Sequence, residues 1–250
     1  MLPPLLLING YAAAGGDWDP AFLAELGSSH RVIRPDNRGM GDAELGAEEL
    51  TVDLMAADME RLLDAEGIDR LPVVGWSMGG FVAQQLGRRA PERVAALALL
   101  DTDPGGAAAV VADSAVWERL TDHSGTPREQ ASRLIALLFP PPLAAEIDAQ
   151  FGDVVAAARE QLAPTALRAQ EAAMTAWHRD DPGPAPAGAP PVLVLHGTED
   201  IVIPPANAQA LAAAWPGARV EMFEGCGHAL MAQEPQRVAE LIRAHANSAG

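Results

Sequence analysis

Short apolar runs bounded by turn residues alternate with longer amphipathic segments along much of the chain. This alternation is typical of a parallel sheet covered by helices, so it predicts an α/β fold. We interpret six of the apolar runs as strands. They are Leu5–Ile8, Arg31–Arg34, Leu71–Val74, Val94–Leu100, Val192–His196 and Arg219–Phe223.

The segments between these runs carry helical patterns. Thr51–Glu66 places apolar residues on one helical stripe, with Thr51 as the N-cap and Gly67 as the stop. Proline also marks helix boundaries, because it is tolerated in the first turn and breaks a helix interior. Further helices are predicted over 78–89 and from near Pro204 or Pro205 to a stop before Pro216 and Gly217. A last one is predicted from near Pro235 onward, with Val238, Leu241 and Ile242 facing inward.

The alternation breaks between Pro104 and Gly188, where the sequence indicates several short helices and no strand. The stretch Asp181–Pro191 is so rich in Pro and Gly that it predicts a linker. We therefore expect a core formed by residues 1–103 and 189–250, with residues 104–188 inserted as a helical cap.

Composition and charge narrow the classes of partner. The formal net charge is −17, which would repel both nucleic acid and anionic lipid, so neither is an expected partner. A single cysteine, Cys226, excludes an intrachain disulfide. The run Leu5–Ile8 is too short to span a bilayer and lacks a basic leader, so a cytoplasmic enzyme is the expectation.

A G-x-S-x-G motif, Gly75 to Gly79, lies between a predicted strand and a predicted helix. This is the context of a nucleophile elbow, in which a sharp turn exposes a serine and brings chain segments too close for side chains at the glycines. Ser77 is therefore the candidate nucleophile. The following helix would point its amides at the same place, where an attacked carbonyl develops negative charge.

A serine hydroxyl needs a base, and the base needs a carboxylate to orient it. Among the six histidines, His228 lies in a Gly-flanked loop after the last predicted strand. Asp200 follows the preceding strand, while Asp101 and Asp103 follow another strand and stay as rivals. The order Ser77, Asp200, His228 is the chain order of α/β hydrolases and not of the unrelated serine proteases.

The sequence resembles the α/β-hydrolase superfamily over nearly its whole length, in particular its small capped esterase, lactonase and cofactor-free haloperoxidase (perhydrolase) branch. The matching stretches are INGY with GGDW, RVIRPDNRGMGD, GWSMGG with APERV, LLDT, HGTEDIVIPP, and GCGHAL with EPQRV. The resemblance implies Ser77 as nucleophile, Asp200 as acid and His228 as base.

The resemblance also implies an oxyanion hole formed by the backbone amides of Tyr11 and Met78. Two features depart from the family: Asn9 replaces the His that often precedes Gly10, and the two N-terminal strands common in the family are expected to be missing. The 31–34 strand would then lie at one edge of the sheet, beside the 5–8 strand, with the remaining strands following in chain order.

Cofactor chemistry is not indicated. No His, Cys or carboxylate cluster has zinc-site spacing, and no P-loop or dinucleotide motif is present, so no metal or cofactor is expected. Cys226 is interpreted as a small packing residue. Apolar substrate contacts are expected from Trp76 and, in the insert, from Trp117, Phe139, Met174 and Trp177.

These features predict a serine hydrolase that cleaves a small ester, lactone or related acyl substrate through an acyl-enzyme. The same triad also serves C–C bond cleavage, perhydrolysis or a non-hydrolytic rearrangement, and these alternatives stay open at this point. A third hypothesis is that the protein is a ligand-binding module with vestigial activity. The pattern does not distinguish a monomer from a homodimer.

Overall fold

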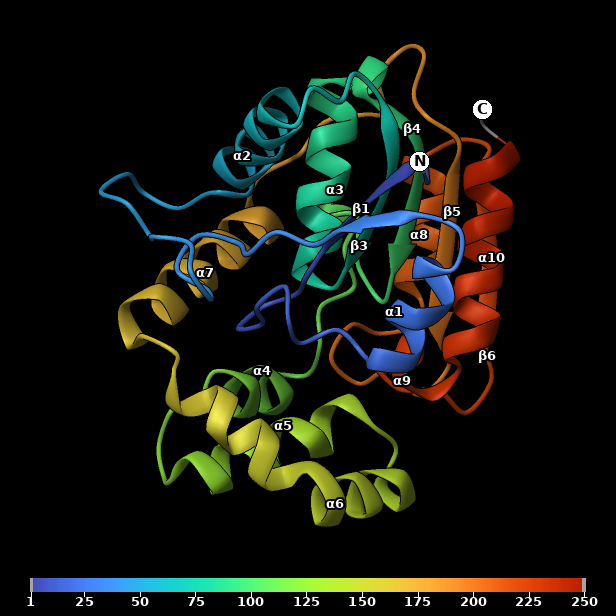
Figure 1. The fold of residues 1–250 in the computed structure, drawn as a ribbon. Helices are drawn as coiled ribbons and strands as arrows, with labels where there is room; N and C mark the ends of the chain where they lie inside the picture. The colour runs from blue at the N-terminus through green and yellow to red at the C-terminus, as the bar shows by residue number, and fades with distance from the viewer. Residues whose placement is uncertain (1, 249–250) are drawn as a thin grey trace.

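The computed structural model describes residues 2–248, and in this part of the chain six strands form one parallel sheet (Figure 1). The sheet order is β2-β1-β3-β4-β5-β6, with every neighbouring pair parallel. The predicted strands and their order are confirmed, with β2 at one edge. The strands are β1 (Pro4–Ile8), β2 (Arg31–Ile33), β3 (Leu71–Trp76), β4 (Val94–Leu100), β5 (Val192–Gly197) and β6 (Arg219–Phe223).

Helices cover both faces of this sheet (Figure 1). Because successive side chains of a strand point to opposite faces, Leu6 and Ile8 of β1 belong to one apolar cluster and Leu5 and Leu7 to the other. All four are fully buried. The first cluster includes residues of α2 (Val52–Ala65), α3 (Met78–Arg89) and α8 (Asn207–Ala214), and the second includes residues of α1 (Pro20–Gly27), α9 (Leu230–Gln233) and α10 (Pro235–Ser248).

The helix boundaries follow local chemistry. The predicted helix α2 starts after Thr51, whose hydroxyl accepts a hydrogen bond from the Leu54 amide, and it ends before Gly67 at φ +64°. The hydrophobic pattern did not indicate α1, although its first turn is marked by Asp19, whose carboxylate accepts from the Phe22 amide. A helix of eight residues is too short for a clear apolar period, so only its cap could have revealed it.

Residues 104–188 form the short 3₁₀-helix η2 (Gly106–Ala108) and four α-helices within the described chain. Pro127, Pro141 and Pro164, which interrupt the hydrophobic pattern, occupy the first positions of three of these helices. Proline fits there because the amide it lacks would have no helical partner. The helices are α4 (Ser114–Leu120), α5 (Pro127–Leu138), α6 (Pro141–Glu160) and α7 (Pro164–Arg179).

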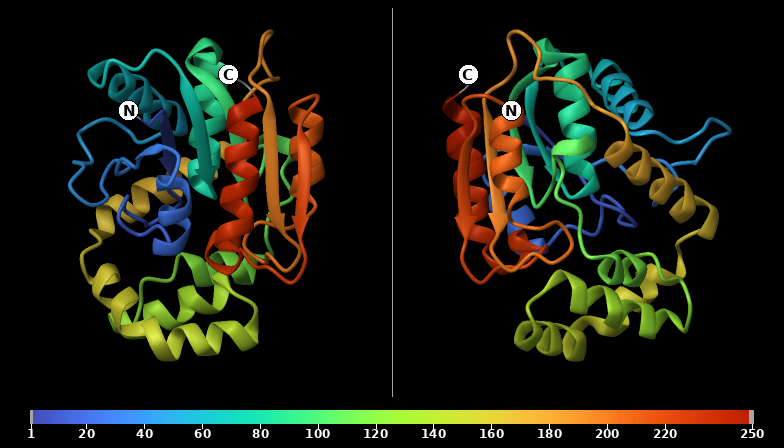
Figure 2. Two further views of the ribbon diagram at one scale, coloured as in Figure 1. Left: turned by 45° about the vertical axis from the view of Figure 1, so that its right-hand side comes forward. Right: turned by 180° about the vertical axis from the view of Figure 1, so that it is seen from behind.

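The helices α4, α5 and α6 lie beyond the carboxyl ends of the strands, whereas α7 returns along the core (Figure 2). Met174 and Trp177 of α7 pack in the same apolar cluster as Phe81 of α3, and the rings of Trp177 and Phe81 stack at 5.3 Å. The following segment, 181–191, has neither helix nor strand, as its proline content predicts.

We expect Thr51→Ala to lower the free energy of unfolding by about 1 kcal/mol, because the first turn of α2 loses its side-chain cap. In a chain of this length such a loss lowers Tm by roughly 2–4 °C, measurable by circular dichroism. Thr51→Ser retains the hydroxyl and serves as the control. Equal Tm values for the Ala and Ser variants would show that the cap contributes little.

Candidate active site

Ser77 occupies a strained turn between β3 and α3, with φ 54° and ψ −125°. Two glycines make this turn possible. A Cβ at Gly75 would lie 2.3 Å from the carbonyl oxygen of Gly79, and a Cβ at Gly79 would lie 2.1 Å from that of Ile8. Any side chain at either position would therefore clash with backbone. The steric role expected of both glycines agrees with these distances.

The structure brings together three side chains that are far apart in the sequence. His228 Nε2 lies 2.9 Å from Ser77 Oγ, and His228 Nδ1 lies 2.7 Å from Asp200 Oδ2. Ser77 follows β3, Asp200 follows β5, and His228 follows β6. All three are buried. Parallel strands end at the same edge of the sheet, so their following loops converge there.

The carboxylate of Asp200 is oriented by its own loop. Its Oδ1 accepts hydrogen bonds from the amides of Val202 and Ile203, which leaves Oδ2 directed at His228. The rival carboxylates have other partners: Asp101 accepts from the backbone amides of Gly197 and Leu230. Asp103, the second rival, lies 2.9 Å from His178 Nε2 and binds the indole of Trp177.

The loop after β1 passes directly beside Ser77. A Cβ at Gly10 would lie 3.1 Å from Ser77 Cβ, so the Gly10–Tyr11 backbone is close to the serine. Asn9 holds this loop by accepting from the Gly10 amide and donating to the carbonyl of Ala14. The Asn9 carbonyl in turn accepts from the Asn37 amide group. Met78, the first residue of α3, is fully buried on the other side of Ser77.

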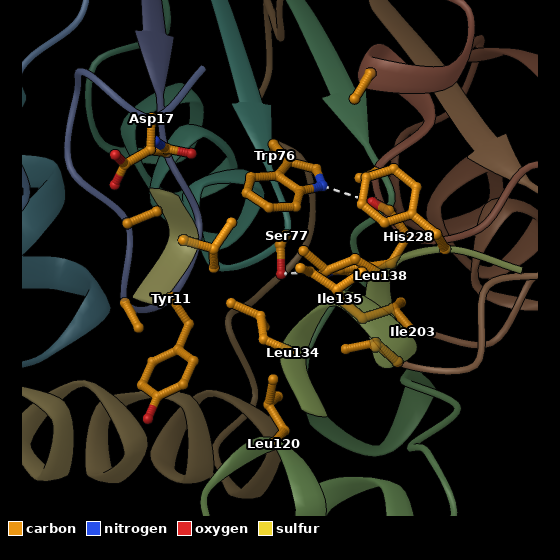
Figure 3. Close-up of a pocket in the computed structure, with 18 of the residues that line it drawn as sticks. Tyr11, Asp17, Trp76, Ser77, Leu120, Leu134, Ile135, Leu138, Ile203 and His228 are labelled. Atoms are coloured by element: carbon orange, nitrogen blue, oxygen red, sulfur yellow. Dashed lines mark hydrogen bonds between the residues drawn. The ribbon is translucent and has the colours of Figure 1, made fainter. Parts of the chain in front are cut away.

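Ser77 and His228 line a cavity of about 1210 Å³ (Figure 3). Of the residues expected to contact substrate, Trp76, Trp117, Phe139 and Met174 line it. Trp177 does not, because its ring is covered by Phe81. Sequence periodicity could not separate these cases, since a cap helix and a core-packing helix both carry an apolar face.

The helical insert supplies much of the cavity wall. Leu120, Leu134, Ile135 and Leu138 from α4 and α5 lie opposite Ser77 in Figure 3. The end of α5 also touches the loop that carries His228, since the Ala229 amide donates to the carbonyl of Leu138 at 3.2 Å. The wall of the cavity is thus built jointly by the sheet edge and the insert.

Comparison with known families agrees with this fold. A family model described as the alpha/beta hydrolase fold matches residues 3–235. The chain belongs to the α/β-hydrolase family. The pimeloyl-[acyl-carrier protein] methyl ester esterase of Aromatoleum aromaticum is 32% identical to this α/β hydrolase over 254 residues, covering 96% of each chain.

Two further relatives are also hydrolases by name. A Cronobacter turicensis protein, provisionally named carbamate hydrolase RutD, is 30% identical, covering 97% of this chain and 90% of that protein. The solved structure of a thermophilic esterase from Thermogutta terrifontis is 27% identical, with a TM-score of 0.73, and covers 99% of this chain and 90% of that one. The family of this chain and the names of its relatives indicate that the protein is a hydrolase.

Asp200 also belongs to a buried cluster of possible metal ligands. Asp101, His196 and Asp200 bring possible ligand atoms within 4.8 Å of one another. Sequence spacing did not reveal the cluster, because Asp101 follows β4 and the other two belong to β5 and its loop. Burial and the charge of Asp200 raise the pKa of Asp101 well above its usual range, and burial lowers the pKa of His196.

The carboxylate oxygens and His196 Nε2 of this cluster are engaged by the protein, whereas His196 Nδ1 is buried without a hydrogen-bond partner. The Asp101 and Asp200 oxygens accept the amides and the imidazole described above, and His196 Nε2 lies 2.9 Å from the carbonyl of Ile203. An incoming cation would compete with His228 for Asp200. The expectation that no metal is needed therefore stays a prediction, supported by this donor set.

A second polar cluster was missed by the sequence analysis. Glu171 Oε1 accepts from the Tyr11 hydroxyl at 2.5 Å and lies 2.7 Å from His123 Nε2. Burial, followed by the contact with Glu171, raises the pKa of Tyr11. Gln170, beside Glu171, accepts from the Ala12 amide. The helix α7 is thus bound to the loop next to Ser77, and no local motif could have indicated this.

We expect Cys226 to react slowly with the thiol reagent DTNB in the native protein. Its side chain is buried, and burial together with Glu234 raises its pKa to about 11, so the reactive thiolate is scarce at neutral pH. Labelling should be fast and stoichiometric once the protein is unfolded in guanidinium chloride, which provides the control. Rapid native labelling would contradict the interpretation of Cys226 as a packing residue.

Proposed function

We propose that this α/β hydrolase cleaves a carboxylic ester, lactone or related acyl substrate through an acyl-enzyme formed on Ser77. The continuous hydrogen-bonded arrangement of Ser77, His228 and Asp200 carries the proposal. His228 takes the Ser77 proton as the oxygen attacks the carbonyl, and then gives it to the leaving group. Asp200 fixes the imidazole tautomer and stabilises the imidazolium. Water, activated by the same imidazole, releases the acid.

The negative charge on the attacked carbonyl oxygen is assigned to two backbone amides, those of Tyr11 and Met78. The close approach of Gly10 to Ser77 and the position of Met78 at the start of α3 support this assignment. The N-terminus of α3 adds its positive dipole end at the same place. Because the amides are backbone groups, the side chain of Tyr11 is free to bind Glu171.

Residues 104–188 are proposed to act as a cap that shapes the substrate site. The α4 and α5 side chains opposite Ser77 and the contact between Leu138 and the His228 loop support this role. A predominantly apolar wall excludes water from the acyl-enzyme except at the mouth of the cavity. Trp117 and Phe139 are the insert residues we assign to apolar contact with substrate, together with Trp76 and Met174.

The named relatives support small molecules as substrates of this chain. No helix of residues 2–248 is both long and apolar enough to cross a membrane. The high acidic charge argues against nucleic acid as a partner. A cytoplasmic location stays a prediction from the sequence.

Ser77→Ala should abolish turnover of a chromogenic short-chain ester, because the covalent route is lost and the residual rate falls by about 10⁶-fold. A fluorophosphonate probe provides the matched readout: it should label the native enzyme at residue 77 and leave the variant unlabelled, with mass spectrometry locating the adduct. Full ester hydrolysis by Ser77→Ala would refute the proposal.

The identity of the acid is tested by a pair of isosteric variants. Asp200→Asn should lower kcat by about 10⁴-fold, because an amide favours the wrong imidazole tautomer. Asp101→Asn should cost far less, since Asp101 accepts from backbone amides and does not touch His228. The reverse ranking in steady-state kinetics would transfer the role of the acid to Asp101.

A further inference from the structure

The wall of the cavity contains a cation without a partner. Arg159, near the end of α6, lines the cavity and is only 8% exposed. Its Nε is buried with no hydrogen-bond partner, and within residues 2–248 no side chain forms an ion pair with its guanidinium. Arginine is rarely buried unpaired, because desolvating its charge costs free energy that no protein contact here offsets.

The other charged residues of the wall are satisfied by the protein. Asp17 and Asp19 accept the amides of Ala14 and Phe22 within their own loop. Asp103 is bound to His178, which also lines the cavity. Each of these side chains has a hydrogen-bond partner in the protein, whereas the Arg159 side chain has none among the described residues.

The nearest acidic group is engaged elsewhere. Burial lowers the pKa of Arg159, and the nearby groups Tyr11 and Glu171 only partly oppose this shift. The Glu171 carboxylate nevertheless binds Tyr11 and His123 and forms no ion pair with Arg159. Arg133, a like charge near Arg159, is itself paired with Asp122. Arg159 thus lines the cavity without an ion-pair partner among residues 2–248.

Arg159 belongs to α6, one of the helices that lie away from the strand ends that position Ser77 (Figure 1). The Tyr11 backbone lies beside Ser77, but its ring points away from the serine, toward Glu171 (Figure 3). The positive charge of Arg159 lowers the pKa of Tyr11 against the larger opposing effects of burial and Glu171, so the two groups lie near each other. Apolar side chains such as Leu120 and Leu134 line the cavity below Ser77 in the same view. A ligand reaching both ends would need an apolar chain between its ester and its second polar group.

We propose that Arg159 binds a carboxylate that the substrate carries at a distance from the carbonyl attacked by Ser77. The inference rests on the proposed function and adds a substrate class to it: esters with an apolar chain and one remote anionic end. A single guanidinium matches a single carboxylate in charge, and its planar donors match the two carboxylate oxygens. The substrate would then supply the partner that the protein lacks.

Two series of probe substrates test this. The first compares monomethyl esters of straight-chain dicarboxylic acids with the dimethyl esters, corrected for their two ester groups. The second compares acetyl esters of hydroxy acids with those of the corresponding hydroxy amides, which places the anion on the alcohol side. At the best chain length of at least one series, kcat/KM should favour the anionic member by about tenfold or more.

Substitutions of Arg159 test whether a preference for the anionic esters comes from its guanidinium. Arg159→Gln should lower the ratio of anionic to neutral kcat/KM by about tenfold, and Arg159→Lys should retain part of it. Arg219→Gln is the matched control, because it removes the same charge from an exposed pair with Glu221 and should leave the ratio unchanged. Arg159→Met should not lower Tm, since it removes an unpaired buried charge.

The outcomes separate the two proposals. Cleavage of the neutral esters depends on Ser77, and the charge preference depends on Arg159. An enzyme that cleaves neutral esters but favours the anionic member in neither series overturns the Arg159 assignment alone. A large fall in Tm for Arg159→Met, or equal losses on anionic and neutral members for Arg159→Gln, would overturn it as well by showing that the side chain only supports the fold.

Discussion

The turn that carries Ser77 constrains the strands and loops packed against it. A serine at φ 54° is held in a region that L-residues rarely occupy, and the surroundings must stabilise it. The Ser77 amide donates to the carbonyl of Leu100, and its carbonyl accepts from the Thr102 hydroxyl, so the turn is tied to β4 and its loop. Gly75 and Gly79 allow the backbones to approach closely enough for this to happen.

The sheet that carries this turn is buried on both faces. A rigid platform of parallel strands places the ends of β3, β5 and β6 at fixed spacing, so the loops that follow can bring Ser77, Asp200 and His228 into contact. The alternating burial of Leu5 to Ile8 in two apolar clusters anchors the first strand, whose loop passes beside the serine. The packing of helices on the sheet thus helps to fix the distances between Ser77, His228 and Asp200.

Polar contacts inside the site fall into two classes. Around the sheet edge, Asn9, Asp101 and Asp200 each hold a loop by accepting backbone amides. In the insert, Glu171 binds Tyr11, while Arg159 is buried without such a contact. The first class preserves the geometry of the triad. The second connects the loop beside Ser77 to the cavity wall.

Local sequence was sufficient for the features that depend on short-range physics. Hydrophobic runs predicted the six strands, Thr51 and the prolines predicted helix starts, and the G-x-S-x-G turn indicated Ser77 because its glycines have a local steric purpose. The chain order of Ser77, Asp200 and His228 added the remaining members as hypotheses. Helix α1 could have been predicted in the same way from its N-cap Asp19, although its hydrophobic pattern alone did not reveal it.

Tertiary structure decided which distant side chains meet. Asp101, Asp103 and Asp200 all follow strands, and only the path of the 198–203 loop directs one of them at His228. Likewise, Trp117 and Trp177 both belong to apolar helix faces, yet one lines the cavity and the other packs on Phe81. Periodicity specifies that a face is buried, but burial is satisfied equally by a cavity wall or by a core, and only the packing of complete helices distinguishes them.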